Sequence, residues 1–153
     1  MPTSYFDKII IADTSCLIVL TNIGKLDLLA QLCGTVLITP EIAGEYGTSL
    51  PEWIQVTAVI DPTKTSAFHQ YLDLGASSAI ALASETNNAL LVLDDKKART
   101  FAQRLGLEIT GTLGLLRSAG QHGLIEDINP IIEKLKKHKF RMPPNIETYL
   151  YDG

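Results

Sequence analysis

The amino-acid sequence predicts an α/β protein in which a parallel sheet carries helices on both faces. Two observations support this fold class. Short runs rich in isoleucine, valine and leucine recur along the 153 residues, as expected of strands that are buried on both sides. Longer amphipathic segments separate these runs, and an alternation of strand and helix is typical of parallel sheets.

The strands are expected at 8–13, 35–39, 54–59, 90–93 and 107–109. The helices are expected at 15–22, 26–33, 40–46, 66–72, 76–85, 96–105, 112–120 and 130–138, with a short turn near the C-terminus. Pro40 suits the first turn of its helix, and Thr39 suits the cap before it. No repeat or linker interrupts the pattern, so we assign a single domain to residues 1–153. The order of the strands in the sheet cannot be read from the sequence.

The composition is that of a soluble globular protein, with 46% apolar and 20% charged residues. The sequence contains no run of 18 apolar residues, and its first residues lack the basic and apolar parts of a signal peptide. Cys16 and Cys33 lie in apolar helical patterns without the spacing of a zinc site, so we expect buried free thiols in a reducing compartment. These features predict a cytoplasmic protein with no membrane partner.

Basic residues gather in two segments, although a net charge of −4 argues against indiscriminate binding to nucleic acid. One segment runs from Lys134 to Arg141, and the other holds Lys96, Lys97, Arg99 and Arg104. Basic runs are usually solvated helix faces. Beside a carboxylate site the same residues could hold a phosphate backbone, and both interpretations stay open.

Acidic residues follow two of the expected strands and occupy one helix. Asp13 follows the first strand, and Asp94 and Asp95 follow the fourth. Glu45 lies in the helix after the second strand. Each residue alone has an ordinary explanation as a helix cap or an exposed side chain. Together they predict a cation site, because strand ends in one parallel sheet share an edge and close carboxylates repel one another. Carboxylates suit Mg²⁺, and such a site can activate water and stabilise a phosphodiester.

The chain resembles a PIN domain in these acidic residues and in several further segments. The resemblance rests on Asp13-Thr14-Ser15, the glutamate after the second strand and the acidic pair after the fourth. It extends through Leu72-Asp73-Leu74-Gly75, Ala79-Ile80-Ala81-Leu82-Ala83, Leu93-Asp94-Asp95-Lys96-Lys97-Ala98-Arg99, Gly111-Thr112-Leu113-Gly114-Leu115-Leu116 and Gly123-Leu124-Ile125. These segments define a core at about 8–126 and leave 127–153 as a C-terminal helical extension. They are similar to the VapC-like toxin ribonucleases of prokaryotes.

The resemblance implies a three-layer α/β/α fold with a mostly parallel central sheet, and cleavage of RNA that depends on Mg²⁺ or Mn²⁺. Asp13, Glu45 and Asp95 would be the metal-site carboxylates, and Asp94 would be close enough to take part. Water would be the nucleophile.

The resemblance also implies residues that bind substrate and a class of partner. Ser15 would donate a hydrogen bond to Asp13 or to a water on the metal. Lys96 and Arg99 would hold the RNA backbone, with a pairing between Arg99 and Asp95 as the alternative. The role would be that of a toxin with a small antitoxin protein. Apolar helical segments at 26–33 and 131–135 could form a surface for the antitoxin or a homodimer, with core packing as the alternative.

One position departs from the family pattern. The subfamily has an acidic residue directly after Gly75, where this chain has Ala76. A carboxylate there would be favoured by the start of the helix and would help to complete the acidic cluster. Asp73 is expected in an exposed loop, with a turn toward the cluster as the alternative. Two functions therefore stay open: a ribonuclease weakened by Ala76, and a catalytically inactive PIN-like module that binds RNA or a protein partner.

Overall fold

A computed structural model describes residues 7–151, so the two ends of the assigned domain, 1–6 and 152–153, lie outside the described residues. Its centre is a five-stranded sheet in which every neighbouring pair of strands is parallel. The strand order is β3-β2-β1-β4-β5. The strands are β1 (Ile9–Ala12), β2 (Thr35–Ile38), β3 (Ile54–Val56), β4 (Ala89–Val92) and β5 (Ile109–Thr110). The predicted fold class is therefore confirmed.

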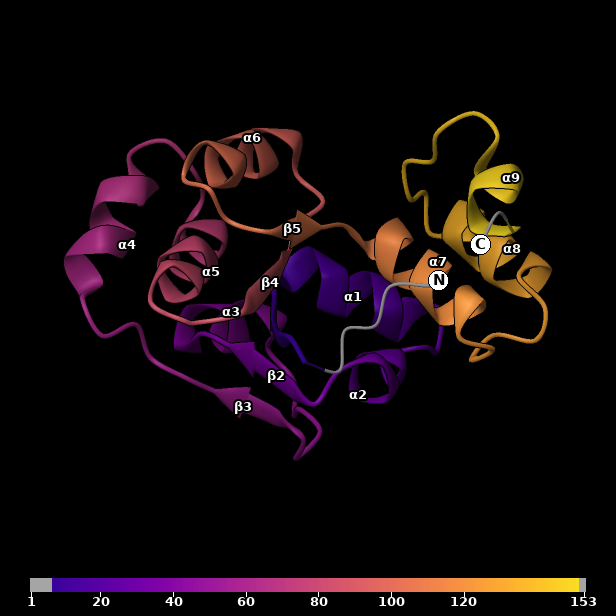
Figure 1. Cartoon of the computed structure of the whole chain (residues 1–153), viewed down its shortest axis with the longest axis horizontal. Coiled ribbons are helices and arrows are strands. Elements are labelled where there is room, and N and C mark those ends of the chain that lie inside the picture. Colours follow the sequence, from indigo (N-terminus) through magenta and orange to yellow (C-terminus); the bar gives the residue numbers. More distant parts are fainter. Residues whose placement is uncertain (1–6, 152–153) are drawn as a thin grey trace.

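The helices cover the sheet in two layers (Figure 1). Helix α5 packs on β1 and β4 and contacts α3 and α4. Helices α1 and α2 each contact α7, and α1 also contacts α3. The bounds are α1 (Thr14–Asn22), α2 (Leu28–Leu32), α3 (Pro40–Tyr46), α4 (Pro62–His69), α5 (Leu74–Ser84), α6 (Lys96–Arg104), α7 (Thr112–Gln121), α8 (Asn129–Lys137) and α9 (Ile146–Tyr151).

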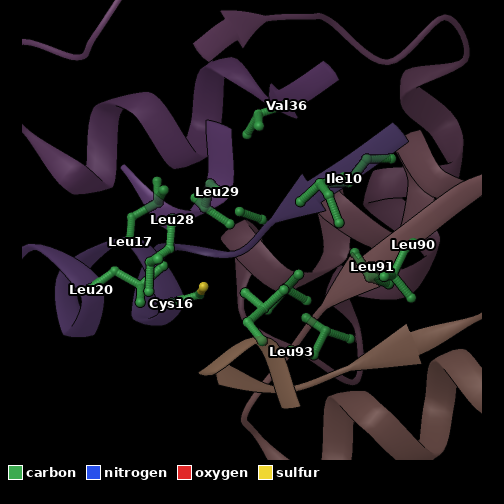
Figure 2. Close-up of a cluster of buried hydrophobic side chains, with 14 of the residues drawn as sticks. Ile10, Cys16, Leu17, Leu20, Leu28, Leu29, Val36, Leu90, Leu91 and Leu93 are labelled. Atoms are coloured by element: carbon green, nitrogen blue, oxygen red, sulfur yellow. The ribbon is translucent and has the colours of Figure 1, made fainter. Parts of the chain in front are cut away.

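The apolar residues of the central strands and of the helices that cover them form one buried core. Ile10, Ile11 and Leu91 are fully buried, and Leu17 and Leu29 reach the sheet from α1 and α2 (Figure 2). The two cysteines are free and buried in this core, as predicted. Continuous burial explains why β1 and β4 read as unbroken apolar runs rather than as alternating ones.

The sheet reverses its direction of growth between β1 and β4. From β1 the chain adds β2 and then β3 on one side, and it crosses back to add β4 and β5 on the other. Ligands of open parallel sheets bind at such a switch point, outside the carboxyl ends of the strands. Ala12 pairs with Val92 in the register of this central pair, so Asp13 and Asp94 both lie just beyond its end.

Several predicted boundaries differ from the observed ones, and β3 ends at Val56 rather than at 59. Helix α4 begins at Pro62 rather than 66, because Asp61 caps it by accepting a hydrogen bond from the Thr63 backbone N–H. Helix α5 begins at Leu74 rather than 76, because Asp73 caps it. Strand β5 begins at Ile109 because the Leu107 N–H donates to the Ala102 carbonyl and thereby closes the end of α6.

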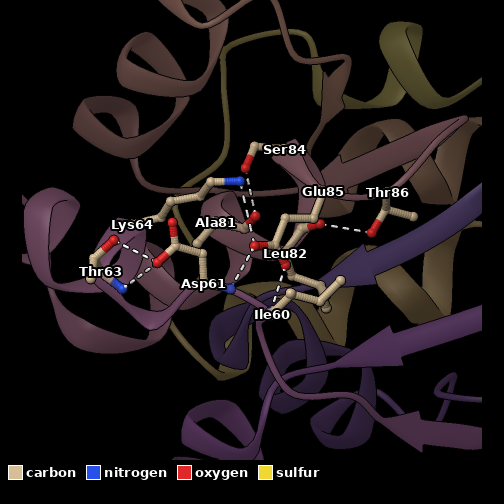
Figure 3. Close-up of polar contacts among 9 residues, drawn as sticks. All are labelled: Ile60, Asp61, Thr63, Lys64, Ala81, Leu82, Ser84, Glu85 and Thr86. Atoms are coloured by element: carbon tan, nitrogen blue, oxygen red, sulfur yellow. Dashed lines mark hydrogen bonds and ion pairs between the residues drawn. The ribbon is translucent and has the colours of Figure 1, made fainter.

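A half-buried glutamate joins the segment before α4 to the end of α5 (Figure 3). Glu85 accepts hydrogen bonds from the backbone N–H groups of Ile60 (2.7 Å) and Asp61 (2.9 Å), and it pairs with Lys64 at 3.4 Å. Burial acts to raise the pKa of Glu85, but these donors outweigh it and the net shift is downward. The contact ties the start of α4 to the end of α5.

Helix α9 packs onto α7, and α8 lies in the same part of the molecule (Figure 1). The apolar side chains of α2 and α8 are buried in the core of the chain. Core packing was one of the two uses that the sequence allowed for these segments, and a partner surface was the other. Between residues 7 and 151, no helix has the length and apolar character needed to cross a membrane.

Candidate functional site

Four carboxylates converge at the switch point of the sheet, and we call them the acidic cluster: Asp13, Glu45, Asp73 and Asp94. Asp13 and Asp94 follow neighbouring strands, Glu45 lies on α3, and Asp73 precedes α5. The charges of the other three all act on Asp13, and those of Asp73 and Glu45 act more strongly than that of Asp94. The strands thus supply the base of the site and two helices supply its sides.

Asp13 is the buried member of the cluster, with 7% of its surface exposed. Its Oδ1 accepts a hydrogen bond from the Thr14 N–H at 2.8 Å, so the residue is also the N-cap of α1. Burial raises the pKa of Asp13 to about 6, the Thr14 hydrogen bond opposes that rise, and the neighbouring carboxylates add to it. A carboxyl group held in this way gains from a nearby cation, because a cation favours its charged form.

Glu45 is exposed, and its carboxylate is positioned by a hydrogen bond from Thr14 and by the space that Gly75 leaves beside it. The Thr14 hydroxyl donates to Glu45 Oε1 at 2.5 Å, which ties α3 to the start of α1. The carboxylate also lies against Gly75, where a Cβ would come within 2.9 Å of the carboxyl carbon. The glycine before Ala76 is therefore required for Glu45 to occupy this place. At the other end of α3, Thr39 caps the helix and shares a hydrogen bond of 2.6 Å with Ser78.

Asp73 lies beside the cluster, although the sequence favoured an exposed loop for it. Its side chain is exposed, but it caps α5 by accepting a hydrogen bond from the Ala76 N–H at 2.8 Å. Among the charges that raise the pKa of Asp13, the charge of Asp73 has the largest effect. Ala76 itself is 2% exposed. A negative charge therefore stands at the start of α5 even though residue 76 carries none.

Asp94 and Asp95 have different surroundings despite being adjacent. Asp94 accepts hydrogen bonds from the Thr112 N–H at 2.8 Å and the Thr112 hydroxyl at 2.5 Å, which fixes it between β4 and α7. Asp95 caps α6 by accepting a hydrogen bond from the Ala98 N–H at 2.9 Å. The charge of Asp94 is among those that raise the pKa of Asp13. Asp94 therefore belongs to the acidic cluster, and Asp95 lies next to it at the start of α6.

The three predicted substrate-binding residues lie around the cluster in different ways. Ser15 is exposed on α1, and the hydrogen bond to Asp13 comes from Thr14 instead. Lys96 is exposed at the start of α6. Arg99 donates from Nη1 to the Leu93 carbonyl at 2.8 Å, which anchors it beside the end of β4.

The acidic cluster fits a divalent cation by charge. The described residues include no group of three or more His, Cys, Asp or Glu side chains placed to hold one ion. Mg²⁺ commonly takes only one or two protein carboxylates and keeps several of its waters. A buried carboxylate faced by three others suits such an ion, because the mutual repulsion falls when a cation lies among them.

Sequence reasoning missed two features of this site. The role of Thr14, which donates through its backbone to Asp13 and through its hydroxyl to Glu45, has only the Asp-Thr-Ser motif as a signal. The capping role of Asp73 has a clearer signal, since Asp before a helix that begins Leu-Gly-Ala is a favoured N-cap.

The chain matches a protein-family model described as PIN domain over residues 9–150. No match to a curated protein or to a solved structure was found. The matched range covers the sheet, the acidic cluster and both C-terminal helices up to Leu150. With acidic residues at the ends of β1 and β4 and a parallel sheet that reverses between them, this chain belongs to the PIN domain family, a family of nucleases.

Proposed function

We propose that the chain is a metal-dependent endoribonuclease that hydrolyses RNA phosphodiesters. The observation that carries this proposal is the convergence of four carboxylates, one of them buried, at the switch point of a PIN-domain sheet. Asp13, Glu45 and Asp94 would hold Mg²⁺ or Mn²⁺, with Asp95 beside them at the start of α6. The bound ion would lower the pKa of a water molecule and offset charge on the phosphodiester.

The residues around the cluster supply positioning. Thr14 holds both Asp13 and Glu45, so the two carboxylates keep a fixed relation before any ligand arrives. Lys96 and Arg99 stand on the α6 side, where they would hold the phosphates that flank the cleaved bond. As part of the same proposal, the physiological role is that of a toxin restrained by a small antitoxin protein.

The alternative is a catalytically inactive PIN-like module that binds RNA or a protein partner, and Ala76 favours it. Losing one of several ligands need not abolish Mg²⁺ binding, since water fills the vacancy. Displacing a reacting group by about 1 Å can nevertheless cost on the order of a hundredfold in rate. Activity measurements decide between the two functions.

An RNA-cleavage assay with Mn²⁺ tests the proposal. We expect the unaltered chain to cleave single-stranded RNA, and we expect EDTA or Asp13→Ala to lower the rate by at least about a hundredfold. Ala76→Glu, which restores the family's acidic residue, is expected to raise the rate. If the unaltered chain and Asp13→Ala are equally inert while Ala76→Glu cleaves, the inactive module is the correct description.

Asp73→Asn is expected to lower the cleavage rate by roughly tenfold, or about 1.4 kcal/mol of transition-state stabilisation. Asparagine keeps an oxygen that can accept the Ala76 N–H, so the substitution removes the charge and retains the cap. Asp61→Asn is the matched control, because Asp61 caps α4 in the same manner. Equal rates for the two variants would show that the Asp73 charge does not serve the site.

A further inference from the structure

A cavity of about 360 Å³ adjoins the acidic cluster on the side of the C-terminal extension. It lies between Arg99 on the first half of α6, the end of β5 with the start of α7, and the C-terminal segment that runs from Phe140 to Tyr149 of α9. Its polar lining comes from Asp94, Arg99, Arg141 and Tyr149, and its apolar lining includes Phe140. This volume falls within the range of small-ligand sites and could hold a single nucleotide.

The cavity and the acidic cluster share Asp94. Its two hydrogen bonds with Thr112 fix the carboxylate in the wall between them. Gly111 makes this arrangement possible, because a Cβ there would lie 2.9 Å from both Asp94 Oδ1 and Arg99 Nη1. A ligand in the cavity is therefore next to the cluster, with a carboxylate at one end and a guanidinium beside it.

Two arginines give the cavity its positive charge. Arg99 donates one hydrogen bond to the Leu93 carbonyl, and the other N–H groups of its guanidinium can bind a ligand. Arg141 is exposed in the joining segment and forms no ion pair with any residue in the described range 7–151. Guanidinium groups bind phosphate in a two-pronged manner. Asp94 would repel a phosphate, so the anion belongs on the arginine side.

Aromatic side chains supply a surface for a base. Phe140 and Tyr149 both line the cavity, and Tyr149 is 38% exposed. The guanidinium of Arg117 lies over one face of the Tyr149 ring, 5.0 Å from its centroid, and holds the ring in place. Bases stack on such side chains with little regard to sequence.

We propose that this cavity binds one nucleotide of the RNA, with its phosphate on Arg99 and Arg141 and its base against Phe140 and Tyr149. The inference rests on the proposed function and extends it: the C-terminal extension, rather than the α/β core alone, supplies part of the substrate site. Of the basic segment from Lys134 to Arg141, Arg141 is the residue that lines this cavity.

Titration of the full chain with adenosine 5′-monophosphate, followed by NMR in EDTA, tests the inference without any cleavage. We expect saturable shifts of the Gly111 and Gly114 amide signals, which report on the cavity wall. Adenosine and inorganic phosphate should each bind at least about tenfold more weakly than the nucleotide, since each lacks half of the contacts. Inorganic phosphate binding as tightly as the nucleotide would overturn the role of the aromatic residues and with it the proposal.

Arg141→Gln is expected to weaken nucleotide binding by about tenfold. Lys137→Gln is the matched control, because it removes the same charge from an exposed position of α8 outside the cavity lining. Tyr149→Leu keeps an apolar side chain but removes the ring, and it is expected to weaken binding by about fivefold or more. Equal affinities for Arg141→Gln and Lys137→Gln would overturn the proposal.

The two proposals fail separately. A chain that binds the nucleotide as described but leaves RNA intact keeps the nucleotide site and loses the endoribonuclease function. A chain that cleaves RNA while Arg141→Gln and Lys137→Gln bind the nucleotide alike keeps the function and loses the site.

Discussion

Asp13→Asn is expected to make the folded chain more stable at pH 7.5 in EDTA, by about 2–3 kcal/mol, while it removes cleavage. The pKa of Asp13 is raised from 3.8 to about 6 in the folded state, chiefly by burial. Each unit of such a shift corresponds to about 1.4 kcal/mol. Asparagine carries no charge to bury and still offers an oxygen to the Thr14 N–H.

The sign of the effect follows from proton linkage. A raised pKa means that the folded state binds the proton more tightly than the unfolded state does. The stability from protonated Asp13 is therefore complete below about pH 3.8 and is lost as the pH rises through about 6. Urea unfolding at pH 7.5 and pH 4 should show a large difference between Asp13→Asn and the unaltered chain at the higher pH and a small one at the lower.

Asp61→Asn is the control for this measurement, because the pKa of Asp61 is shifted downward whereas that of Asp13 is shifted upward. Asp61 also caps a helix, but hydrogen bonds from Thr63 lower its pKa, so removing its charge should not stabilise the chain at pH 7.5. If Asp13→Asn were no more stable than Asp61→Asn at that pH, the burial of an ionised Asp13 would not be a cost to the fold.

Gly75→Ala is expected to reduce cleavage by about tenfold to a hundredfold without unfolding the chain. The added Cβ would overlap the Glu45 carboxylate, and Glu45 would have to leave its hydrogen bond with the Thr14 hydroxyl. A displacement of about 1 Å at a reacting centre is enough for a loss of this size. Cleavage rate and Mn²⁺ affinity, measured on the same preparation, report the change.

Gly44→Ala is the matched control for Gly75→Ala. Gly44 lies on α3 next to Glu45, and a Cβ there would meet nothing within 4 Å. Alanine in place of a helical glycine stabilises by about 0.5–1 kcal/mol, so this variant should be more stable and equally active. Equal activity of the two variants would mean that the position of Glu45 beside Gly75 does not matter to the reaction.

Local patterns predicted the elements of the sheet but not their arrangement. The apolar runs that became β1 and β4 are recognisable because both are buried on two faces, and Pro40 with Thr39 marked the start of α3 at the observed residue. The pairing of β1 with β4 depends on the long crossover through α4 and α5. Neither apolar run contains a signal that specifies the other as its neighbour in the sheet.

In the candidate site, too, the sequence predicted some residues, whereas others depend on the folded arrangement. Asp13 and Glu45 could be selected from strand ends and family resemblance, but the choice between Asp94 and Asp95 could not. Consecutive side chains leave the chain in different directions, and here the Thr112 donors engage the first while the α6 backbone engages the second. The position of Arg141 in the wall of the neighbouring cavity could not be predicted either, because it depends on how the extension folds back onto α7.

The carboxylates of the site are all engaged by the backbone or side chains of residues at helix starts. Asp13 receives the first N–H of α1, Asp94 the first N–H of α7, and Asp73 a first-turn N–H of α5. The positive ends of three helix dipoles therefore point into the acidic cluster. An ion that enters would meet carboxylates whose orientation these hydrogen bonds already fix, and one or two of them would be its direct ligands while water supplied the rest.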